Sequence, residues 1–207
     1  MNQKEMMLLA QKTQEIYERN GPRFDMERPK VLYEKEWLSR FQELLPPRAK
    51  ILDAGCGAGE PIAQYFICRG FDLTGIDFSQ SILDIAKSRF PDHQWLQMDM
   101  RKLNLEKKFE GIIAWHSFFH LIPEDQRETL KCFSNHLTPG GVLLLTIGHE
   151  EGEVIGNVGD DKVYHASLSI EEYTSILNSL NIETIHFVPE DPHCGGTSVL
   201  LAQKKEL

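Results

Sequence analysis

The sequence predicts an α/β protein in which one mostly parallel sheet is covered by helices on both faces. Short apolar runs alternate with segments of helical periodicity through most of the chain. The runs are almost purely apolar, which is typical of strands buried on both faces. The last two runs have no helix between them, so we expect those two strands to pair antiparallel.

The first 45 residues are predicted to be helical. Apolar residues recur at near-helical spacing on either side of Gly21-Pro22, which we expect to separate two helices. Pro46-Pro47 ends the second helix. We therefore expect a single domain over residues 1–207, built from a helical extension (1–45) and an α/β core (46–207).

Within the core, the helices carry their own start and stop signals. Pro61 suits the first turn of a helix that Gly70 ends, and Ser79 caps the next helix. Ser169 and Glu172 match a capping box. The expected strands are residues 49–53, 72–77, 94–98, 111–115, 141–147, 182–188 and 198–202, and the expected core helices are residues 61–69, 79–90, 123–137 and 169–180.

Composition and charge narrow the classes of function. The 22 basic and 31 acidic side chains give a net charge of −9, which disfavours a nucleic-acid partner. No apolar run approaches the length of a membrane span and no signal peptide is recognisable, so we expect a cytoplasmic protein without a membrane partner. The four cysteines form no CxxC pair, and we expect no metal site. The oligomeric state is not predicted.

The segment 51–59 reads ILDAGCGAG and lies between a predicted strand and a predicted helix. Its glycines let the backbone approach a ligand, and the helix N-terminus presents free N–H groups. The dinucleotide fingerprint GxGxxG is not met, because its third glycine would fall on Glu60 or Ile62. Asp53 beside the loop would repel pyrophosphate and favour a cationic ligand. An NAD-dependent oxidoreductase is therefore a disfavoured alternative.

Two further carboxylates, Asp77 and Asp99, end the second and third predicted strands. A carboxylate at the position of Asp77 can accept hydrogen bonds from ribose hydroxyls. Phe78 could pack on an adenine face, and Asp99 could accept a bond from the adenine amino group. Either aspartate alone could be a helix cap, but the ordered set with Asp53 predicts a site for an adenosyl ligand.

Five motifs in order, ILDAGCGAG, GIDFS, QMDM, FEGIIAWHSFFHL and LTPGGVLLLTI, resemble the class I S-adenosylmethionine-dependent methyltransferases from about Ala49 onward. The tracts EPIAQYF, AWHSFFHLIPEDQR, VYHASLSIEEY and DPHCGGTSVLLA resemble a bacterial group of small methyltransferases within that family. The resemblance implies a Rossmann-like sheet of seven strands in the order 3-2-1-4-5-7-6 with strand 7 antiparallel. It also implies S-adenosylmethionine as cofactor and methyl transfer to a small-molecule acceptor, mainly by positioning. A non-enzymatic protein that kept the fold and binds the cofactor is the other alternative.

The resemblance also implies roles for single residues. The loop from Gly55 to Gly59 would line the methionine part of the cofactor, Asp77 would hold the ribose, and Asp99 and Met100 would flank the adenine. The N-terminal helices could close over the cofactor with Tyr17 near its carboxylate. The full expected cofactor set is Tyr17, Asp53, Gly55, Cys56, Gly57, Gly59, Asp77, Phe78, Asp99, Met100 and Trp115.

The fourth strand ends in WHSFFH, at the strand end that faces the transferring methyl group in this family. Trp115 could pack beside the sulfonium or the adenine. His116 and His120 are candidate bases, because imidazole titrates near neutrality. Members of the bacterial group often carry Asp where this chain has His116. Residues 149–167 are rich in glycine and acidic residues, and we expect either a lid or a plain surface loop there.

Overall fold

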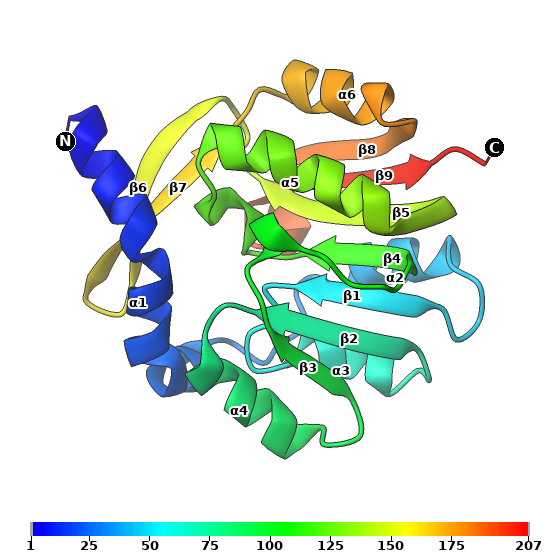
Figure 1. Cartoon of the computed structure of the whole chain (residues 1–207), viewed down its shortest axis with the longest axis horizontal. Helices are drawn as coiled ribbons and strands as arrows, with labels where there is room; N and C mark the ends of the chain where they lie inside the picture. Colours follow the sequence, from blue (N-terminus) through cyan, green and yellow to red (C-terminus); the bar gives the residue numbers. More distant parts are fainter. Residues whose placement is uncertain (1, 207) are drawn as a thin grey trace.

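The computed structural model describes residues 2–206 and has the expected α/β architecture (Figure 1). The main sheet contains β1 (Lys50–Ala54), β2 (Asp72–Asp77), β3 (Gln94–Gln97), β4 (Phe109–Ala114), β5 (Leu137–Ile147), β8 (Ile182–Asp191) and β9 (Thr197–Lys204). Their order is β3-β2-β1-β4-β5-β9-β8, and β9 runs antiparallel to both of its neighbours. Because β6 and β7 form a separate hairpin, β8 and β9 are the sixth and seventh strands of the main sheet. The strand order is therefore the expected 3-2-1-4-5-7-6, which is confirmed.

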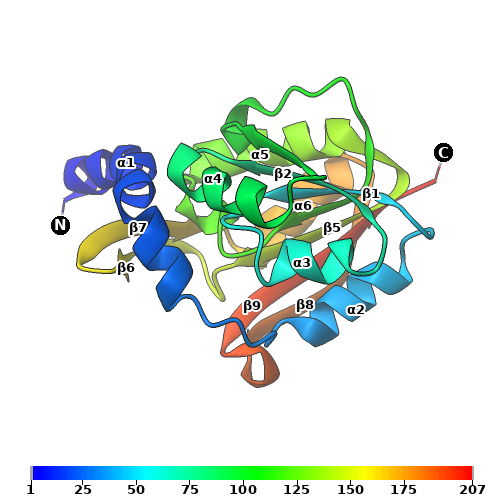
Figure 2. The same ribbon diagram turned by 90° about the horizontal axis from the view of Figure 1, so that it is seen from below.

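Helices cover both faces of the sheet (Figure 2). One face packs against α2 (Lys35–Glu43), α3 (Ile62–Ile67) and α4 (Gln80–Arg89), and the other against α5 (Pro123–His136) and α6 (Ile170–Ser179). Successive strand side chains alternate between the faces, so Ile113 joins the first core and Ile112 the second. Among residues 2–206, no helix is both long enough and apolar enough to cross a membrane.

The first helix, α1, runs unbroken over Gln3–Glu27, so the predicted break at Gly21-Pro22 is wrong. Proline lacks the N–H that would bond the carbonyl of Glu18, one turn earlier. That carbonyl instead accepts a hydrogen bond from the Ser81 hydroxyl at 2.8 Å. A Cβ on Gly21 would lie only 2.6 Å from the same hydroxyl oxygen. The Gly-Pro pair is therefore where α1 packs on α4. The hydrogen bond from Ser81 replaces the one that Pro22 cannot donate within the helix.

The segment expected to be a loop (149–167) forms a β-hairpin instead, with β6 (Gly152–Val158) and β7 (Asp161–Ser167) joined at Gly159-Asp160. Val163 and Tyr164 of β7 are fully buried and pack against apolar residues of α1. Both α1 and the hairpin lie beyond the carboxyl ends of the parallel strands (Figure 1). The prediction failed because the partner that buries this hairpin is α1, far away in the sequence.

Candidate functional site

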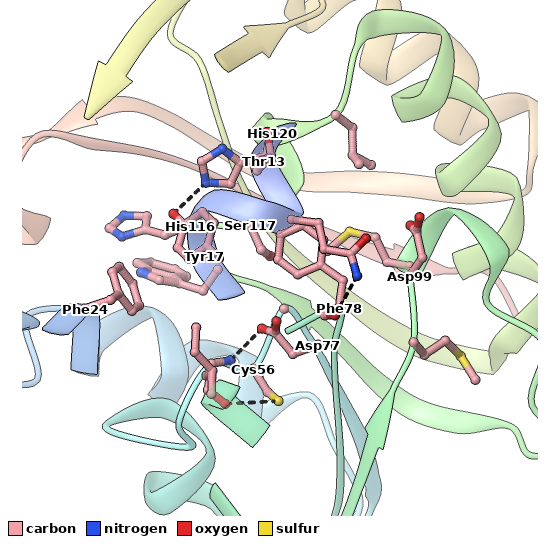
Figure 3. A pocket seen from close by; sticks show the side chains of 18 of the residues that line it. Thr13, Tyr17, Phe24, Cys56, Asp77, Phe78, Asp99, His116, Ser117 and His120 are labelled. Carbon is pink, nitrogen blue, oxygen red and sulfur yellow. Dashed lines mark hydrogen bonds between the residues drawn. The ribbon is translucent and has the colours of Figure 1, made fainter. Parts of the chain in front are cut away.

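A cavity of about 340 Å³ lies at the carboxyl ends of β1 to β4, next to α1 (Figure 3). Its wall brings together nearly all of the residues expected to bind a cofactor or to act on the acceptor. Those in the wall are Tyr17, Asp53, Gly55, Cys56, Gly57, Asp77, Phe78, Asp99, Met100, Trp115, His116 and His120. Gly59 is not in the wall, because it packs against α4 and β3. A Cβ there would lie 3.1 Å from the rings of Phe90 and Trp95.

The glycine-rich loop adopts left-handed backbone at Gly55 (φ 80°) and Gly57 (φ 53°), a region that favours glycine. The N–H of Gly55 donates to the carbonyl of Ile76 at 2.8 Å, which ties the loop to β2. A Cβ on Gly55 would lie 2.3 Å from the Cβ of Ser117. The loop after β1 and the loop after β4 therefore meet at a point where only glycine fits.

Asp77 joins the glycine-rich loop to the start of α4. One carboxylate oxygen accepts from the Gly57 N–H at 3.0 Å, and the other accepts from the Ser79 N–H at 2.9 Å. Burial raises the pKa of Asp77 to about 6, although these N–H groups oppose the rise. Each oxygen keeps acceptor capacity, which suits a ligand that brings hydroxyl donors.

Asp53 is the second buried carboxylate in the wall of this cavity. Its side chain is 2% exposed, and burial raises its pKa to about 7. Arg28 opposes this rise and Asp77 adds to it. Two buried carboxylates in one wall are costly without nearby positive charge. The arrangement therefore favours a ligand that carries a cationic group into this cavity.

A further part of the cavity wall is formed by Phe78, Asp99 and Met100. Gln14 of α1 donates to the Phe78 carbonyl at 3.0 Å, so α1 contacts this part of the wall. Burial would raise the pKa of Asp99, but hydrogen bonds from Arg101 outweigh it and leave the pKa below its ordinary value. Asp99 is thus an ionised acceptor, partly engaged by Arg101, beside an aromatic ring and a thioether.

His116 and His120 follow β4. Burial lowers the pKa of His120 to about 3, so this imidazole is neutral at physiological pH. The pKa of His116, whose side chain is more exposed, is also lowered from its ordinary value. His120 Nδ1 lies 3.0 Å from the carbonyl of Tyr164, and its Nε2 lies 2.9 Å from the Tyr17 hydroxyl. Because a carbonyl only accepts, Nδ1 carries the proton and Nε2 accepts from Tyr17. This geometry makes His120 a group that positions Tyr17.

His116 sits in strained backbone, with φ at 51°. A side chain with a Cβ is uncommon there, and such residues cluster at functional sites. The His116 N–H donates to the Thr146 hydroxyl at 2.7 Å, and this hydrogen bond stabilises the strained backbone conformation. The ring contacts the Thr197 hydroxyl, with 3.2 Å between Nε2 and Oγ1. The imidazole is therefore fixed at the end of β4.

Two polar groups of the wall were missed in the sequence, because both lie in the N-terminal extension, where no motif marked them. Thr13 Oγ1 and Arg28 Nε are buried, and neither has a hydrogen-bond partner among residues 2–206. Arg28 Nη2 lies 3.4 Å from Glu34 Oε1. An unsatisfied hydroxyl and a guanidinium facing one cavity suit a ligand carboxylate.

A second cavity of about 520 Å³ adjoins the first. It lies among the β6–β7 hairpin, the end of β5 and the connection between β8 and β9. The two cavities share five wall residues, namely Tyr17, Phe24, Arg28, His116 and His120. The two cavities therefore lie next to each other at the strand end that carries the two histidines.

The sheet order, the glycine-rich loop and the carboxylates at the strand ends define the Rossmann-like fold of the class I methyltransferases. Residues 51–141 match the methyltransferase domain family. The chain is 30% identical over 118 residues to YqeM, a Bacillus subtilis protein named as a methyltransferase, which covers 54% of this chain and 47% of that protein.

A second relative is a sugar-modifying enzyme, the dTDP-3-amino-3,4,6-trideoxy-alpha-D-glucopyranose N,N-dimethyltransferase of Streptomyces venezuelae. It is 30% identical over 102 residues, which are 48% of this chain and 43% of that enzyme. The chain spans about half the length of the curated relatives it matches.

Among solved structures, the chain resembles CalS10 with bound S-adenosylmethionine, an amino pentose methyltransferase from Micromonospora echinaspora. The TM-score is 0.70 at 19% identity, over 87% of this chain and 93% of that one. Likeness at this identity establishes the fold. The chain thus has the fold of the S-adenosylmethionine-dependent methyltransferases, and residues 51–141 match their domain family.

Proposed function

We propose that this chain is an S-adenosylmethionine-dependent methyltransferase that acts on a small molecule in the cytoplasm, with residues 1–207 working as one domain. The observation that carries the proposal is the 340 Å³ cavity, in which Asp53 and Asp77 face the glycine-rich loop at the strand ends. Asp77 receives the ribose hydroxyls, while Phe78, Asp99 and Met100 receive the adenine. The buried carboxylate of Asp53 favours the positive charge of the cofactor.

The amino-acid end of the cofactor is held by the extension. Thr13 Oγ1 and Arg28 Nε are the unpartnered buried donors in this wall, and a carboxylate satisfies both. When bound, S-adenosylmethionine supplies a methyl group on a cationic sulfur, and the electron pair of the breaking carbon–sulfur bond stays on sulfur as the acceptor forms its new bond. The chain contributes position, desolvation and an aromatic surround from Tyr17, Phe24 and Trp115.

Calorimetry with S-adenosylmethionine, S-adenosylhomocysteine and NAD tests the proposal. We expect both adenosyl ligands to bind with about micromolar affinity and NAD not to bind, because two carboxylates flank the place where its pyrophosphate would lie. Binding of NAD alone would favour the oxidoreductase. If the adenosyl ligands bind and no methyl group is transferred to any small molecule offered, the non-enzymatic alternative is correct.

Replacing Arg28 with alanine is expected to weaken S-adenosylhomocysteine binding by about tenfold, because a charge-assisted hydrogen bond to the ligand carboxylate is lost. Methylthioadenosine has the same adenosine but no carboxylate, so its affinity should not change. Calorimetry with both ligands on both proteins measures the difference. Equal losses for the two ligands would show that Arg28 acts on the fold of the site rather than on the carboxylate.

Cofactor binding is expected to weaken as the pH falls, because the pKa values of Asp53 and Asp77 are raised to about 7 and about 6. Both carboxylates start from an ordinary value of 3.8. The ligand-free folded chain thus keeps protons on Asp53 and Asp77 at pH values where the unfolded chain has released them. This proton binding adds to the free energy of unfolding at low pH, and the added stability is lost as the pH rises through about 6 to 7.

A cationic ligand favours the ionised carboxylates, so binding releases protons, and affinity falls by up to about tenfold per pH unit below each pKa. Calorimetry between about pH 5 and pH 8, in buffers of different ionisation enthalpy, measures both effects. An affinity that stays constant over this range would contradict the assignment of Asp53 and Asp77 to the cofactor.

A further inference from the structure

We propose that the 520 Å³ cavity binds the methyl acceptor, and that the acceptor is a small hydroxylated amine without a phosphate group. This inference rests on the proposed function. It goes further by assigning a second site and a chemical class of substrate, and it makes Glu190 the residue that holds the amine.

The position of the cavity makes it the acceptor site. It shares Tyr17, Phe24, Arg28, His116 and His120 with the cofactor cavity, and it extends away from these residues toward the hairpin and the β8–β9 connection. In-line transfer requires donor and acceptor on opposite sides of the methyl group. Two cavities that meet at a common wall of aromatic and imidazole rings meet this requirement.

The charges in the wall exclude an anionic substrate. Among the described residues of this wall, the only lysine or arginine is Arg28, and its guanidinium lies beside Glu34. Glu27 is in an ion pair with Arg23. Glu190 lines the rim with an exposed side chain, and its carboxylate has no ion-pair partner within residues 2–206. A phosphate group needs cationic or N–H donors, and this wall offers an unpaired carboxylate instead. The Streptomyces relative is named for a dTDP-linked sugar, and the acceptor proposed here differs from that one in having no phosphate.

The remaining polar groups suit hydroxyls and an amino group. The wall contains hydroxyl, amide and imidazole side chains, which both donate and accept. Those beyond the shared residues are Thr146, His149, Asn157, His165, Thr197 and Ser198. Burial lowers the pKa of His165, so this imidazole is neutral and can accept from an N–H group. Glu190 is held in left-handed backbone (φ 45°), and its N–H donates to the Ser198 hydroxyl at 3.0 Å.

The transfer balances without a further reactant. The lone pair of the neutral amine forms the new nitrogen–carbon bond, and the nitrogen becomes cationic as sulfur becomes neutral. The methylated ammonium then releases its proton to water. Glu190 acts by stabilising the positive charge that develops on nitrogen.

The test uses the whole chain loaded with S-adenosylhomocysteine and three probes, namely glucosamine, its phosphate monoester and glucose. Saturation-transfer NMR reports weak binding of each probe. Transfer of an isotope-labelled methyl group from S-adenosylmethionine is the second readout. We expect glucosamine to bind at least about tenfold more tightly than the other two, because glucose lacks the amine and the ester carries anionic charge.

Glu190→Gln should remove about tenfold of the glucosamine affinity and bring it close to that of glucose, while S-adenosylhomocysteine binding is unchanged. Glu183→Gln is the matched control, because Glu183 lies at the other end of β8 beside Lys205 and outside both cavities. Equal or tighter binding of the phosphate ester, an unaltered affinity in Glu190→Gln, or no binding of glucosamine would overturn the inference. Loss of S-adenosylhomocysteine binding in the unmodified chain would overturn the proposed function instead.

Discussion

Replacing Asp77 with alanine is expected to weaken the binding of S-adenosylmethionine and S-adenosylhomocysteine by about a hundredfold, or about 3 kcal/mol. Two losses add up in this variant. The ribose loses an ionised acceptor, and the N–H groups of Gly57 and Ser79 lose the carboxylate that fixes the loop on α4. Asp77→Asn keeps the shape and one acceptor oxygen, so it should lose less affinity than the alanine variant.

Asp72→Ala is the matched control. Asp72 begins the same strand, is half exposed and lies 3.6 Å from Lys107, far from the cavity wall. We expect its cofactor affinity to equal that of the unmodified chain, because a surface ion pair contributes little. Calorimetry gives the affinities, and thermal denaturation shows whether each variant is folded. A folded Asp77→Ala chain with full affinity would refute the ribose-binding role.

The core of the fold could be predicted because its signals are local. Ser79 caps α4 as expected, with its hydroxyl accepting from the Ile82 N–H, and Ser169 caps α6 through the Glu172 N–H. Most residues of the central strands β1, β2, β4 and β5 are buried, as their apolar runs predict. Such patterns depend on the chain's own sequence over a few residues, and no distant partner can change them much.

The errors lie where a distant partner decides the local structure. Gly21-Pro22 reads as a helix break, but Ser81 of α4 satisfies the carbonyl that the proline leaves free. The segment 149–167 reads as a glycine-rich loop, but α1 buries one face of the hairpin that forms there. Both errors concern contacts of α1, with α4 in the first case and with the hairpin in the second.

The residues of the candidate site could likewise be predicted where their signals are local, and not where a distant partner decides their position. Asp53, Asp77 and the glycine-rich loop could be placed from sequence, because strand ends of a parallel sheet share one edge. Thr13 and Arg28 could not, because their importance comes from lying unpartnered in a wall that exists only after α1 has folded over the sheet. The low pKa of His120 also depends on burial and on His165, which comes from the hairpin.

Gly55→Ala is expected to destabilise the chain by about 3 kcal/mol and to weaken cofactor binding by at least about tenfold. Two costs combine at this position. An L side chain is strained at φ 80°, and its Cβ would lie 2.3 Å from the Ser117 Cβ and 2.7 Å from the Ser117 hydroxyl oxygen. Ser117 must then move, which breaks its hydrogen bond to the Ala54 carbonyl. The loop that receives the cofactor moves with it.

Gly70→Ala separates these two costs. Gly70 has nearly the same φ, 79°, but a Cβ there meets nothing within 4 Å. It should therefore cost only the backbone strain, about 1 kcal/mol, and leave cofactor affinity unchanged. Urea denaturation measures both stabilities and calorimetry measures both affinities. The difference between the two variants is the energy of the contact between the first loop and Ser117. If the two variants were equally stable, the loops after β1 and β4 would not be in the close contact on which the shape of the cofactor cavity depends.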